Sequence, residues 1–283
     1  PHLSGALDLY KQSKNFGGDP EIIISNSSHL NWWKDSQTSL LHFFDKHLKN
    51  NDSSKRINNK NRIIWNISLN KWESIEHLPL NYEFGLESDG NANFNVRDGS
   101  LTINSKSSGF VSIVHDPWRP VPLDGGHLGQ NPGFFDRSKV DKRLDVAVFQ
   151  THYLKENIHL SGIPTLHTVV ASDQESFDIC VALSIISAEE EQIINQFTTG
   201  FLRIRKSQKD IEKDYVIKFH PTNISIMKGS KLRLSLSASA WPAIGVNPGD
   251  NKIRCGNTSI DHKITTLNFN LEKSIMKINP FFK

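Results

Sequence analysis

The sequence predicts a mainly β protein, in which a short α/β segment precedes a large β-sandwich of the jelly-roll kind. Residues 1–49 carry apolar side chains at the spacing of helices, around one short apolar run. From residue 63 onward the apolar spacing changes to two, and short β-rich runs recur between Gly, Pro, Asn and Asp turns. Residues 50–62 are rich in Asn, Asp, Ser and Lys, which is typical of a solvated linker. We therefore expect an α/β part at 1–49, a linker at 50–62 and a β domain at 63–283.

The α/β part has the pattern of a helix, a strand, a loop and a second helix. A loose helical pattern over 3–16 ends at two glycines and an Asp-Pro pair, and the apolar run 21–25 predicts a strand. A polar turn follows, and Asp35 or Ser36 offers an N-cap for the second helix. The apolar face of that helix is expected to consist of Leu40, Leu41, Phe43, Phe44 and Leu48.

The β domain is expected to be built from a series of short strands, and convincing long helices are missing from its sequence. The runs that predict strands lie at 63–69, 111–114, 145–151, 167–171, 177–186, 200–205, 215–219 and 231–240. In the last run, Leu and Ala at even positions alternate with Arg and Ser at odd positions. This alternation predicts that one face of the strand is buried and that the other is wet.

Composition excludes several classes of function. The net charge is only +3, from 33 basic and 30 acidic residues, and no block of like charges offers an arm for nucleic acid. No stretch approaches the roughly 18 apolar residues that a membrane helix needs, so we expect a soluble protein that binds neither nucleic acid nor membrane. Two cysteines cannot form a disulfide framework, which favours a reducing, cytoplasmic compartment. Cys180 lies inside an apolar run and is expected to be a small buried residue rather than a nucleophile.

No complete catalytic set can be read from the sequence. Neither a Gly-x-Ser-x-Gly elbow nor a phosphate loop nor a His-Glu-x-x-His helix occurs, and we expect neither a cofactor nor a metal. His29 stands out because it follows an apolar strand in a loop of small residues, where α/β enzymes present reactive side chains. Judged by the residues alone, an ordinary loop histidine is the more frequent explanation. Trp32 and Trp33 come next and are either core filler or walls of a substrate pocket. His42 and His47 do not share a helix face and are expected to point to solvent rather than to a metal.

Turn segments along the chain resemble those of a known hydrolase family. His115-Asp116-Pro117-Trp118-Arg119-Pro120-Val121-Pro122, followed by Gly125-Gly126-His127, resembles the Asp-Pro-x-x-Pro-Val-Pro…Gly-Gly pattern of the cocaine-esterase-like and X-Pro dipeptidyl-peptidase-like (CocE/NonD) serine hydrolases. Further segments follow in the order of that family, at 143–151, 171–178, 200–203, 228–234 and 241–249. Within the family, the sequence is most similar to the members that resemble glutaryl-7-aminocephalosporanic acid acylase.

The resemblance implies a fold and a division of the chain. Residues from about 62 onward would form a galactose-binding-like jelly roll, and residues 1–49 would be the end of an α/β-hydrolase domain. Residues 43–49 resemble the Phe-Phe-Asp-x-x-Leu-Lys helix with which that domain ends. His29 matches the position of the triad histidine, although residues 25–28 read Ser-Asn-Ser-Ser where the family has Gly-Pro-Trp-x.

The resemblance also implies a Ser-His-Asp mechanism, in which only the general base, His29, belongs to this chain. The triad acid would lie at or just before Pro1, and the serine further upstream; neither Asp8 nor Asp19 fits the place of the acid. We therefore expect a parent serine hydrolase that acts on a small ester or amide, and an inactive chain when these 283 residues stand alone. The β domain would pack on the missing hydrolase domain, help to wall its active site and offer a surface for a homo-oligomer.

Two alternatives stay open. The first is a module that binds carbohydrate or protein without catalysis, which would need a row of exposed aromatic side chains at a spacing of two along a strand. The second is a parent that has lost activity, for which the altered loop before His29 is the sign.

Overall fold

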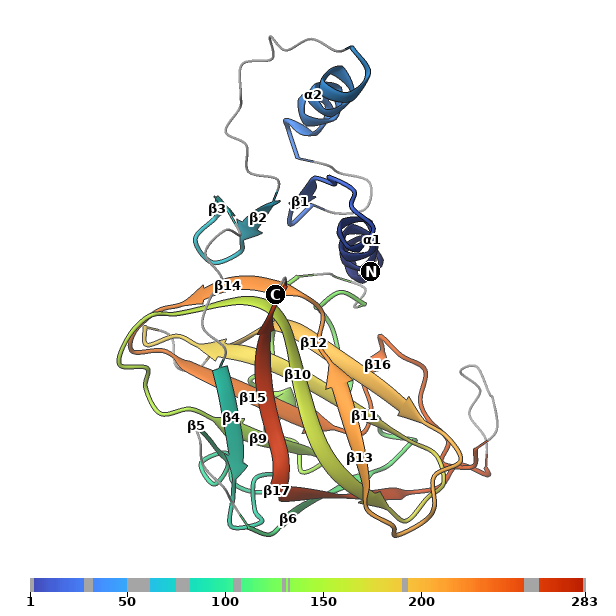
Figure 1. The fold of residues 1–283 in the computed structure, drawn as a ribbon. Coiled ribbons are helices and arrows are strands. Elements are labelled where there is room, and N and C mark those ends of the chain that lie inside the picture. Colours follow the sequence, from blue (N-terminus) through green and yellow to red (C-terminus); the bar gives the residue numbers. More distant parts are fainter. Residues whose placement is uncertain are drawn as a thin grey trace. The chain divides into compact units, whose positions relative to one another are not determined.

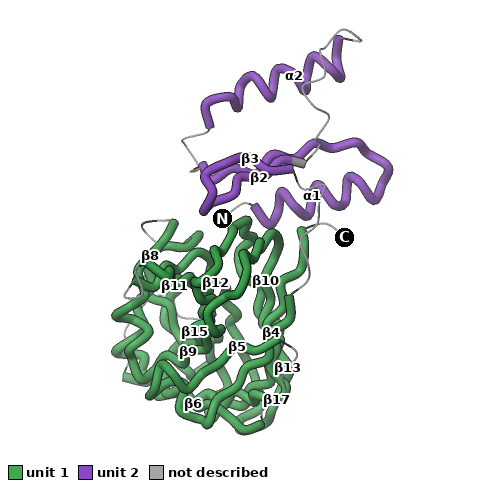
Figure 2. The backbone as a smooth tube through the Cα atoms, turned by 90° about the vertical axis from the view of Figure 1, so that its left-hand side faces the viewer, with its two compact units in different colours: residues 1, 79–283 green, residues 2–78 purple. Residues whose placement is uncertain are grey.

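The computed structural model describes residues 3–27, 33–49, 62–74, 82–103, 108–128, 131, 133–189, 193–251 and 260–281. They form two compact units, an N-terminal unit within residues 2–78 and a β unit within residues 79–283, which Figure 2 draws in purple and green. Most of the described residues in regular structure lie in strands, so the mainly β fold is confirmed.

The N-terminal unit is a small α/β layer. It contains α1 (Leu3–Asn15), β1 (Ile22–Ile24), α2 (Ser36–Leu48), β2 (Arg62–Asn66) and β3 (Lys71–Ser74). Helix α1 buries Leu7 and Tyr10, and it ends before Gly17, whose φ of +83° is a conformation that glycine adopts without strain. The two predicted helices and the predicted strand are confirmed, with small differences at their ends.

The three strands of this unit lie in the order β1-β2-β3. Strand β1 is parallel to β2, with Ile22 opposite Arg62 and Ile24 opposite Ile64, and β2 forms an antiparallel pair with β3. This pairing places residues 62–74 in the N-terminal unit, whereas the sequence pattern assigned residues from 63 onward to the β domain. The alternation of a strand does not reveal which sheet it joins, because that depends on pairing between distant segments. Residues 50–61 of the expected linker lie outside the described residues.

In its described residues, the β unit contains fourteen strands and one short 3₁₀ helix. In chain order they are β4 (Tyr82–Glu87), β5 (Ser100–Ile103), β6 (Phe110–His115), β7 (Pro122–Leu123), β8 (Phe135–Asp136), η1 (Val140–Lys142), β9 (Val146–Gln150), β10 (Ile158–Ser172), β11 (Phe177–Ile186), β12 (Ile194–Ile204), β13 (Lys213–Lys218), β14 (Thr222–Ile226), β15 (Lys231–Ser237), β16 (Trp241–Pro242) and β17 (Thr265–Pro280). The long strands β10 and β17 were predicted only in part or not at all, although β17 alternates along most of its length.

A single twelve-stranded sheet forms the body of the β unit. Its main path runs β13-β10-β17-β4-β5-β9-β15-β11-β12-β8, while β14 pairs with β10 and β6 with β17. The sheet curls on itself, so that β10 and β17 face β11 and β15 across one large apolar core (Figure 1). A bridge between Gly200 of β12 and Phe219, just after β13, closes the curl. Glycine is required there, because a Cβ on residue 200 would lie 2.5 Å from the backbone oxygen of Lys218.

The structure corrects one prediction about β15. Its Leu side chains enter the main core as expected, but the opposite face is also buried rather than wet. Arg233 is 6% exposed, Ser235 1% and Ser237 5%. The alternation of apolar and polar residues was read correctly, but the polar face is covered by another part of the chain, with which its side chains form hydrogen bonds.

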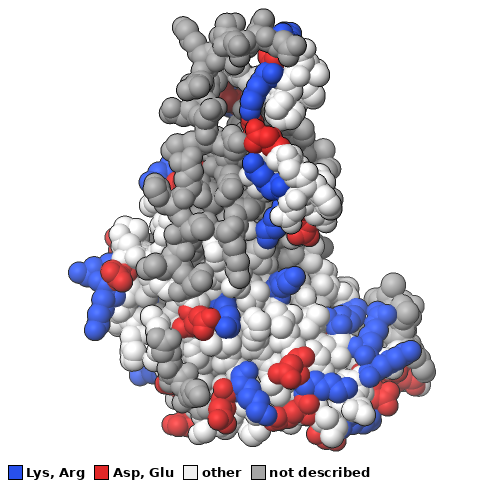
Figure 3. Space-filling model, viewed as in Figure 1, with Lys and Arg blue, Asp and Glu red and all other residues white. Residues whose placement is uncertain are grey.

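Acidic and basic side chains are interspersed over the face of the β unit that Figure 3 shows. Within the described residues, no helix has the length and apolar character to span a bilayer.

Candidate functional site

The residues predicted to act in catalysis follow β1 in the sequence. His29 and Trp32 fall outside the described residues, so their roles stay predictions. The chain reaches them directly from Ile24, the last residue of a parallel strand. In α/β folds, the carboxyl ends of parallel strands are where ligands bind and where catalytic side chains are placed.

Trp33 belongs to a cluster of three tryptophans in the N-terminal unit. Its ring meets that of Trp72 edge to face, with centroids 6.0 Å apart, and Trp72 meets Trp65 in the same way at 5.1 Å. Trp72 is still 38% exposed. The hairpin of β2 and β3 therefore contacts the segment that follows His29, and whether this cluster also lines a substrate pocket stays a prediction.

His42 and His47 lie exposed on α2, as predicted. Among the described residues, no group of three or more His, Cys, Asp or Glu side chains is placed to hold a metal ion. Cys180 is 3% exposed, and burial raises the pKa of its thiol well above the ordinary value, so it is not poised as a nucleophile.

Several of the family-like segments meet in a clamp around Asp178 of β11. Its carboxylate accepts two hydrogen bonds from the Arg203 guanidinium, at 2.9 and 2.7 Å, and a third from Asn247 Nδ2 at 2.9 Å. Arg203 also donates to the carbonyl oxygen of Gly245, and Ser176 Oγ donates to Asn247 Oδ1 at 3.0 Å. Residues from 176–178, 203 and 245–247 thus fix the loop after β16 to the sheet.

A second set of contacts fixes the Asp-Pro-x-x-Pro-Val-Pro segment. Arg143 forms two hydrogen bonds with Asp145, and its guanidinium also donates to the carbonyl oxygen of Arg119 at 2.7 Å. The bond to Asp145 is the largest cause of a raised pKa of Arg143. Strand β7 of this segment pairs with β16, with Trp241 opposite Pro122. The family-like segments therefore converge in space, and their visible contacts hold loops in place.

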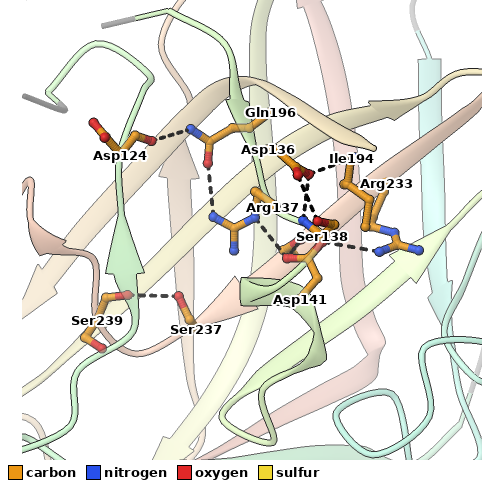
Figure 4. Close-up of polar contacts among 11 residues, drawn as sticks. Asp124, Asp136, Arg137, Ser138, Asp141, Ile194, Gln196, Arg233, Ser237 and Ser239 are labelled. Atoms are coloured by element: carbon orange, nitrogen blue, oxygen red, sulfur yellow. Dashed lines mark hydrogen bonds and ion pairs between the residues drawn. The ribbon is translucent and has the colours of Figure 1, made fainter. Parts of the chain in front are cut away.

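The covered face of β15 is a buried polar layer (Figure 4). Asp141 of η1, whose side chain is fully buried, accepts from Arg137 Nε at 2.9 Å, Arg233 at 3.3 Å and Ser235 Oγ at 3.0 Å. Arg137 also donates to Gln196 Oε1 at 3.0 Å. Burial lowers the pKa of Arg233, because the charged guanidinium is removed from water. The layer joins segment 137–141 to the sheet through charge-assisted hydrogen bonds.

The sequence analysis did not predict this layer. Arg137 and Asp141 are four residues apart, which is a usable signal for an ion pair on one helical turn. That two arginines share one carboxylate depends on β15, which lies about ninety residues later and whose polar face was expected to be wet.

Two histidines stack where the sheet closes. The rings of His127 and His220 are 4.3 Å apart and nearly parallel, and His127 Nδ1 lies 3.3 Å from Thr199 Oγ1. Burial lowers the pKa of His127 to about 4; burial, and then repulsion from His127, lower that of His220 to about 3. Gly126 allows this approach, because a Cβ there would lie 2.9 Å from Thr199 Oγ1.

This pair does not form a catalytic triad. The Thr199 hydroxyl lies beside the His127 imidazole, as a nucleophile lies beside its general base. However, no described carboxylate hydrogen-bonds to the far side of the His127 ring or of the His220 ring. Depressed pKa values keep both rings neutral at pH 7, which fits a packing role.

Comparisons with known proteins agree with the stabilising and packing roles of these contacts in the β unit. A family model described as the X-Pro dipeptidyl-peptidase C-terminal non-catalytic domain matches residues 46–274. No curated protein matches the chain significantly.

Three solved structures show the same fold. An aminopeptidase from a marine sediment Thaumarchaeota archaeon has a TM-score of 0.72 and 14% identity, over 92% of this chain and 49% of its own. An α-amino acid ester hydrolase has a TM-score of 0.73 and 16% identity, over 96% of this chain and 51% of its own. A CocE/NonD-family hydrolase from Staphylococcus aureus has a TM-score of 0.58 and 13% identity, over 87% of this chain and 46% of its own.

This chain thus spans about half the length of those relatives. The matched segment covers the clamp, the polar layer and the histidine stack, none of which forms a catalytic set in the described residues. The chain belongs to the family of X-Pro dipeptidyl-peptidase C-terminal non-catalytic domains, which is found in CocE/NonD-type hydrolases.

Proposed function

We propose that this chain is the C-terminal portion of a serine hydrolase that acts on an ester or an amide, and that His29 is its general base. The observation that carries the hydrolase assignment is the family match over 46–274, a segment that begins after His29. The role of His29 is supported by β1, a parallel strand whose carboxyl end leads into the segment that contains His29.

In the proposed reaction, His29 takes the proton from a serine hydroxyl as its oxygen attacks the carbonyl carbon of the substrate. The protonated imidazole then gives that proton to the leaving alcohol or amine as the acyl-enzyme forms. In the second half-reaction it activates water, which releases the acid and the free serine. The serine, and the aspartate that orients the imidazole, belong to the preceding half of the parent protein.

The β unit has a supporting role in this proposal. The Asp178–Arg203 clamp holds the loop after β16 against the sheet, and the polar layer holds segment 137–141 against it. This loop and this segment would then pack on the hydrolase domain and help to wall its active site. A role for Trp32 and Trp33 in the substrate pocket belongs to the same proposal.

A fluorophosphonate probe tests the proposal, because it forms a covalent bond only with an activated serine. We expect the parent protein to be labelled, the His29→Gln parent to be labelled at least a thousandfold more slowly, and the 283-residue chain not at all. His42→Gln in the parent is the matched control, since His42 lies exposed on α2. Equal labelling of the His29→Gln parent, or labelling of the chain alone, would refute the assignment, and an unlabelled parent would indicate lost activity.

The alternative of a binding module has less support. Among the described strands, exposed aromatic side chains occur singly, at Trp72, Phe110 and Trp241, and not in rows. A glycan-array screen of the whole chain checks this, and saturable binding would favour the module.

A further inference from the structure

The sheet of the β unit closes along a seam with few hydrogen bonds. One side of the seam consists of Thr198, Thr199 and Gly200 of β12, and the other of Phe219 and His220, just after β13. Among the described strands, β12 forms ladders only with β11 and β8, and β13 only with β10. The isolated bridge between Gly200 and Phe219 therefore closes the sheet in place of a full ladder.

The backbone of His220 is held at this seam. Its N–H donates to the carbonyl oxygen of Thr199 at 2.8 Å, and its own carbonyl oxygen accepts from Thr198 Oγ1 at 2.7 Å. The N–H of Phe219 donates to the carbonyl oxygen of Pro164 of β10 at 2.9 Å. The place of the His220 side chain is therefore set by the closure of the sheet.

The second histidine reaches the seam from a tight turn after β7. Gly126, with a φ of +64°, exchanges two backbone hydrogen bonds with Gly133. The ring of His127, the next residue, contacts that of His220 with centroids 4.3 Å apart and that of Phe201 at 6.0 Å. Two segments that are far apart in the sequence thus meet through the two imidazole rings.

Uncharged rings suit this position, and charged rings do not. The rings of His127 and His220 are nearly parallel, so two imidazolium ions would face each other with like charges. Burial disfavours the charged form and lowers the pKa of both rings, and no described carboxylate is a cause that raises either pKa.

Charged groups on the neighbouring segments do not compensate a charge on the stack. Lys218 is exposed, and the other four already have hydrogen-bonded partners among the described residues. These other four are Asp124, Asp136, Arg137 and Arg203. A proton on either ring would therefore meet no free counter-ion in the described part of the seam.

We propose that the stack of His127 and His220 is a pH-sensitive switch, whose protonation opens the seam while the other strands of the β unit stay paired. In the open form water reaches both rings, so each takes a proton at the ordinary pKa of 6.5. The open form then binds more protons than the closed form as the pH falls from 6.5, and its population rises. The parts released from β12 are the turn at 124–128 and residues 219–220.

The expected size of the effect follows from the two pKa values. With closed-state values of about 4 and about 3, a change from pH 7.5 to pH 5 would favour the open form by roughly a thousandfold for fully shielded rings. Both rings are partly exposed, and half of the corresponding free energy is an effect of about thirtyfold. The inference goes beyond the proposed function and does not depend on it, because it concerns residues of the β unit alone.

Native-state hydrogen exchange of the 283-residue chain tests the proposal. The hydrogen-bonded amides of Gly126, Phe219 and His220 report on the seam, and that of Leu234 in β15 reports on the body of the sheet. After correction for the intrinsic pH dependence of exchange, the opening constants of the seam amides should rise about thirtyfold from pH 7.5 to pH 5. Because the opening is local, these constants should change little in low concentrations of urea, whereas that of Leu234 should rise.

Substitutions separate the switch from a general loosening of the seam. His220→Gln stays uncharged at every pH and should reduce the pH effect at the other seam amides to about fivefold, and the double variant with His127→Gln should remove it. His220→Lys carries a permanent charge and should open the seam already at pH 7.5. The matched controls are His152→Gln and His152→Lys, which should behave as the wild type because His152 lies exposed before β10.

Three results would overturn the inference. The first is that the seam amides follow Leu234 in both pH and urea dependence, because acid would then unfold the whole sheet. The second is an unchanged pH effect in the double variant. The third needs no variant: imidazole titration of the wild type by NMR should give pKa values below 6.5 for His127 and His220, and values of 6.5 or above would exclude the switch.

Discussion

Asp141→Asn, a change in the buried polar layer, is expected to destabilise the β unit more than the removal of a carboxylate from its surface. The substitution keeps the shape of the side chain but removes the one carboxylate that Arg137 and Arg233 share. Both arginines are more than nine-tenths buried, so their charges would be left without a counter-ion in a medium that solvates them poorly. Breaking a buried ion pair from one side typically costs about 3–5 kcal/mol.

A loss of that size is a large part of the stability of an ordinary domain, which is about 5–15 kcal/mol. At about 2–4 °C per kcal/mol, the melting temperature should fall by roughly 10 °C. Glu83→Gln is the matched control, because it removes a carboxylate from an exposed pair with Lys277, 2.9 Å long and worth about 0.2–1 kcal/mol.

Urea unfolding of the 283-residue chain, followed by far-ultraviolet circular dichroism and by tryptophan fluorescence, measures both variants. The slope of the free energy against urea should stay unchanged, because the same surface becomes exposed. If Asp141→Asn costs no more than Glu83→Gln, the polar layer does not carry the energy assigned to it and the reasoning fails.

Three further outcomes are expected. Acid should destabilise the β unit, because the folded pKa values of about 4 for His127 and about 3 for His220 lie below the unfolded value of 6.5. In the pH range between the folded and unfolded values, the unfolded chain binds more protons than the folded chain. Lowering the pH from 7.5 to 5 should cost about 2 kcal/mol, half of the roughly 4 kcal/mol that the two full shifts would give, because both rings are partly exposed. His220→Asn should flatten the pH dependence in urea titrations; an equally steep dependence in the variant would contradict this. Gly200→Ala should weaken the closure of the sheet by about 1–3 kcal/mol, since its Cβ would meet backbone at 2.5 Å, and a variant as stable as the wild type would show that the seam can yield. Arg203→Lys should speed hydrogen exchange in residues 245–249, because lysine cannot make the paired hydrogen bonds to Asp178, and unchanged exchange would mean that other contacts hold the loop.

The sequence predicted those parts of the fold that depend on local periodicity. Helices α1 and α2 and the buried strand β11 follow from spacing and composition alone, with ends within a few residues. Strand β15 was also located correctly, and the alternation of its leucines gave the correct core face. Local pattern was sufficient to predict these elements, whereas β17 also alternates along most of its length and was not predicted.

The features that the sequence did not predict depend on pairing between segments that lie far apart in the chain. The odd positions of β15 are polar, and polar residues usually face water, so the layer around Asp141 could be recognised only once η1 was known to cover them. For a similar reason the sequence did not show that the β2–β3 hairpin joins β1 in the N-terminal unit, because only its register with β1 reveals its sheet. His29 stood out by its place in a loop after an apolar strand, the family resemblance made it the candidate base, and its role stays a prediction until the parent is labelled.

The place of β17 in the sheet has a consequence for the order in which the protein can fold during synthesis. It is the last of the described strands along the chain, yet it lies between β10 and β4 and is also the partner of β6. Until it emerges from the ribosome, the edges of β10 and β4 that it occupies have no partner strand, and the two halves of the sheet meet through the bridge at Gly200. Both halves then expose unpaired strand edges, which makes this interval the one in which the nascent chain depends most on chaperones.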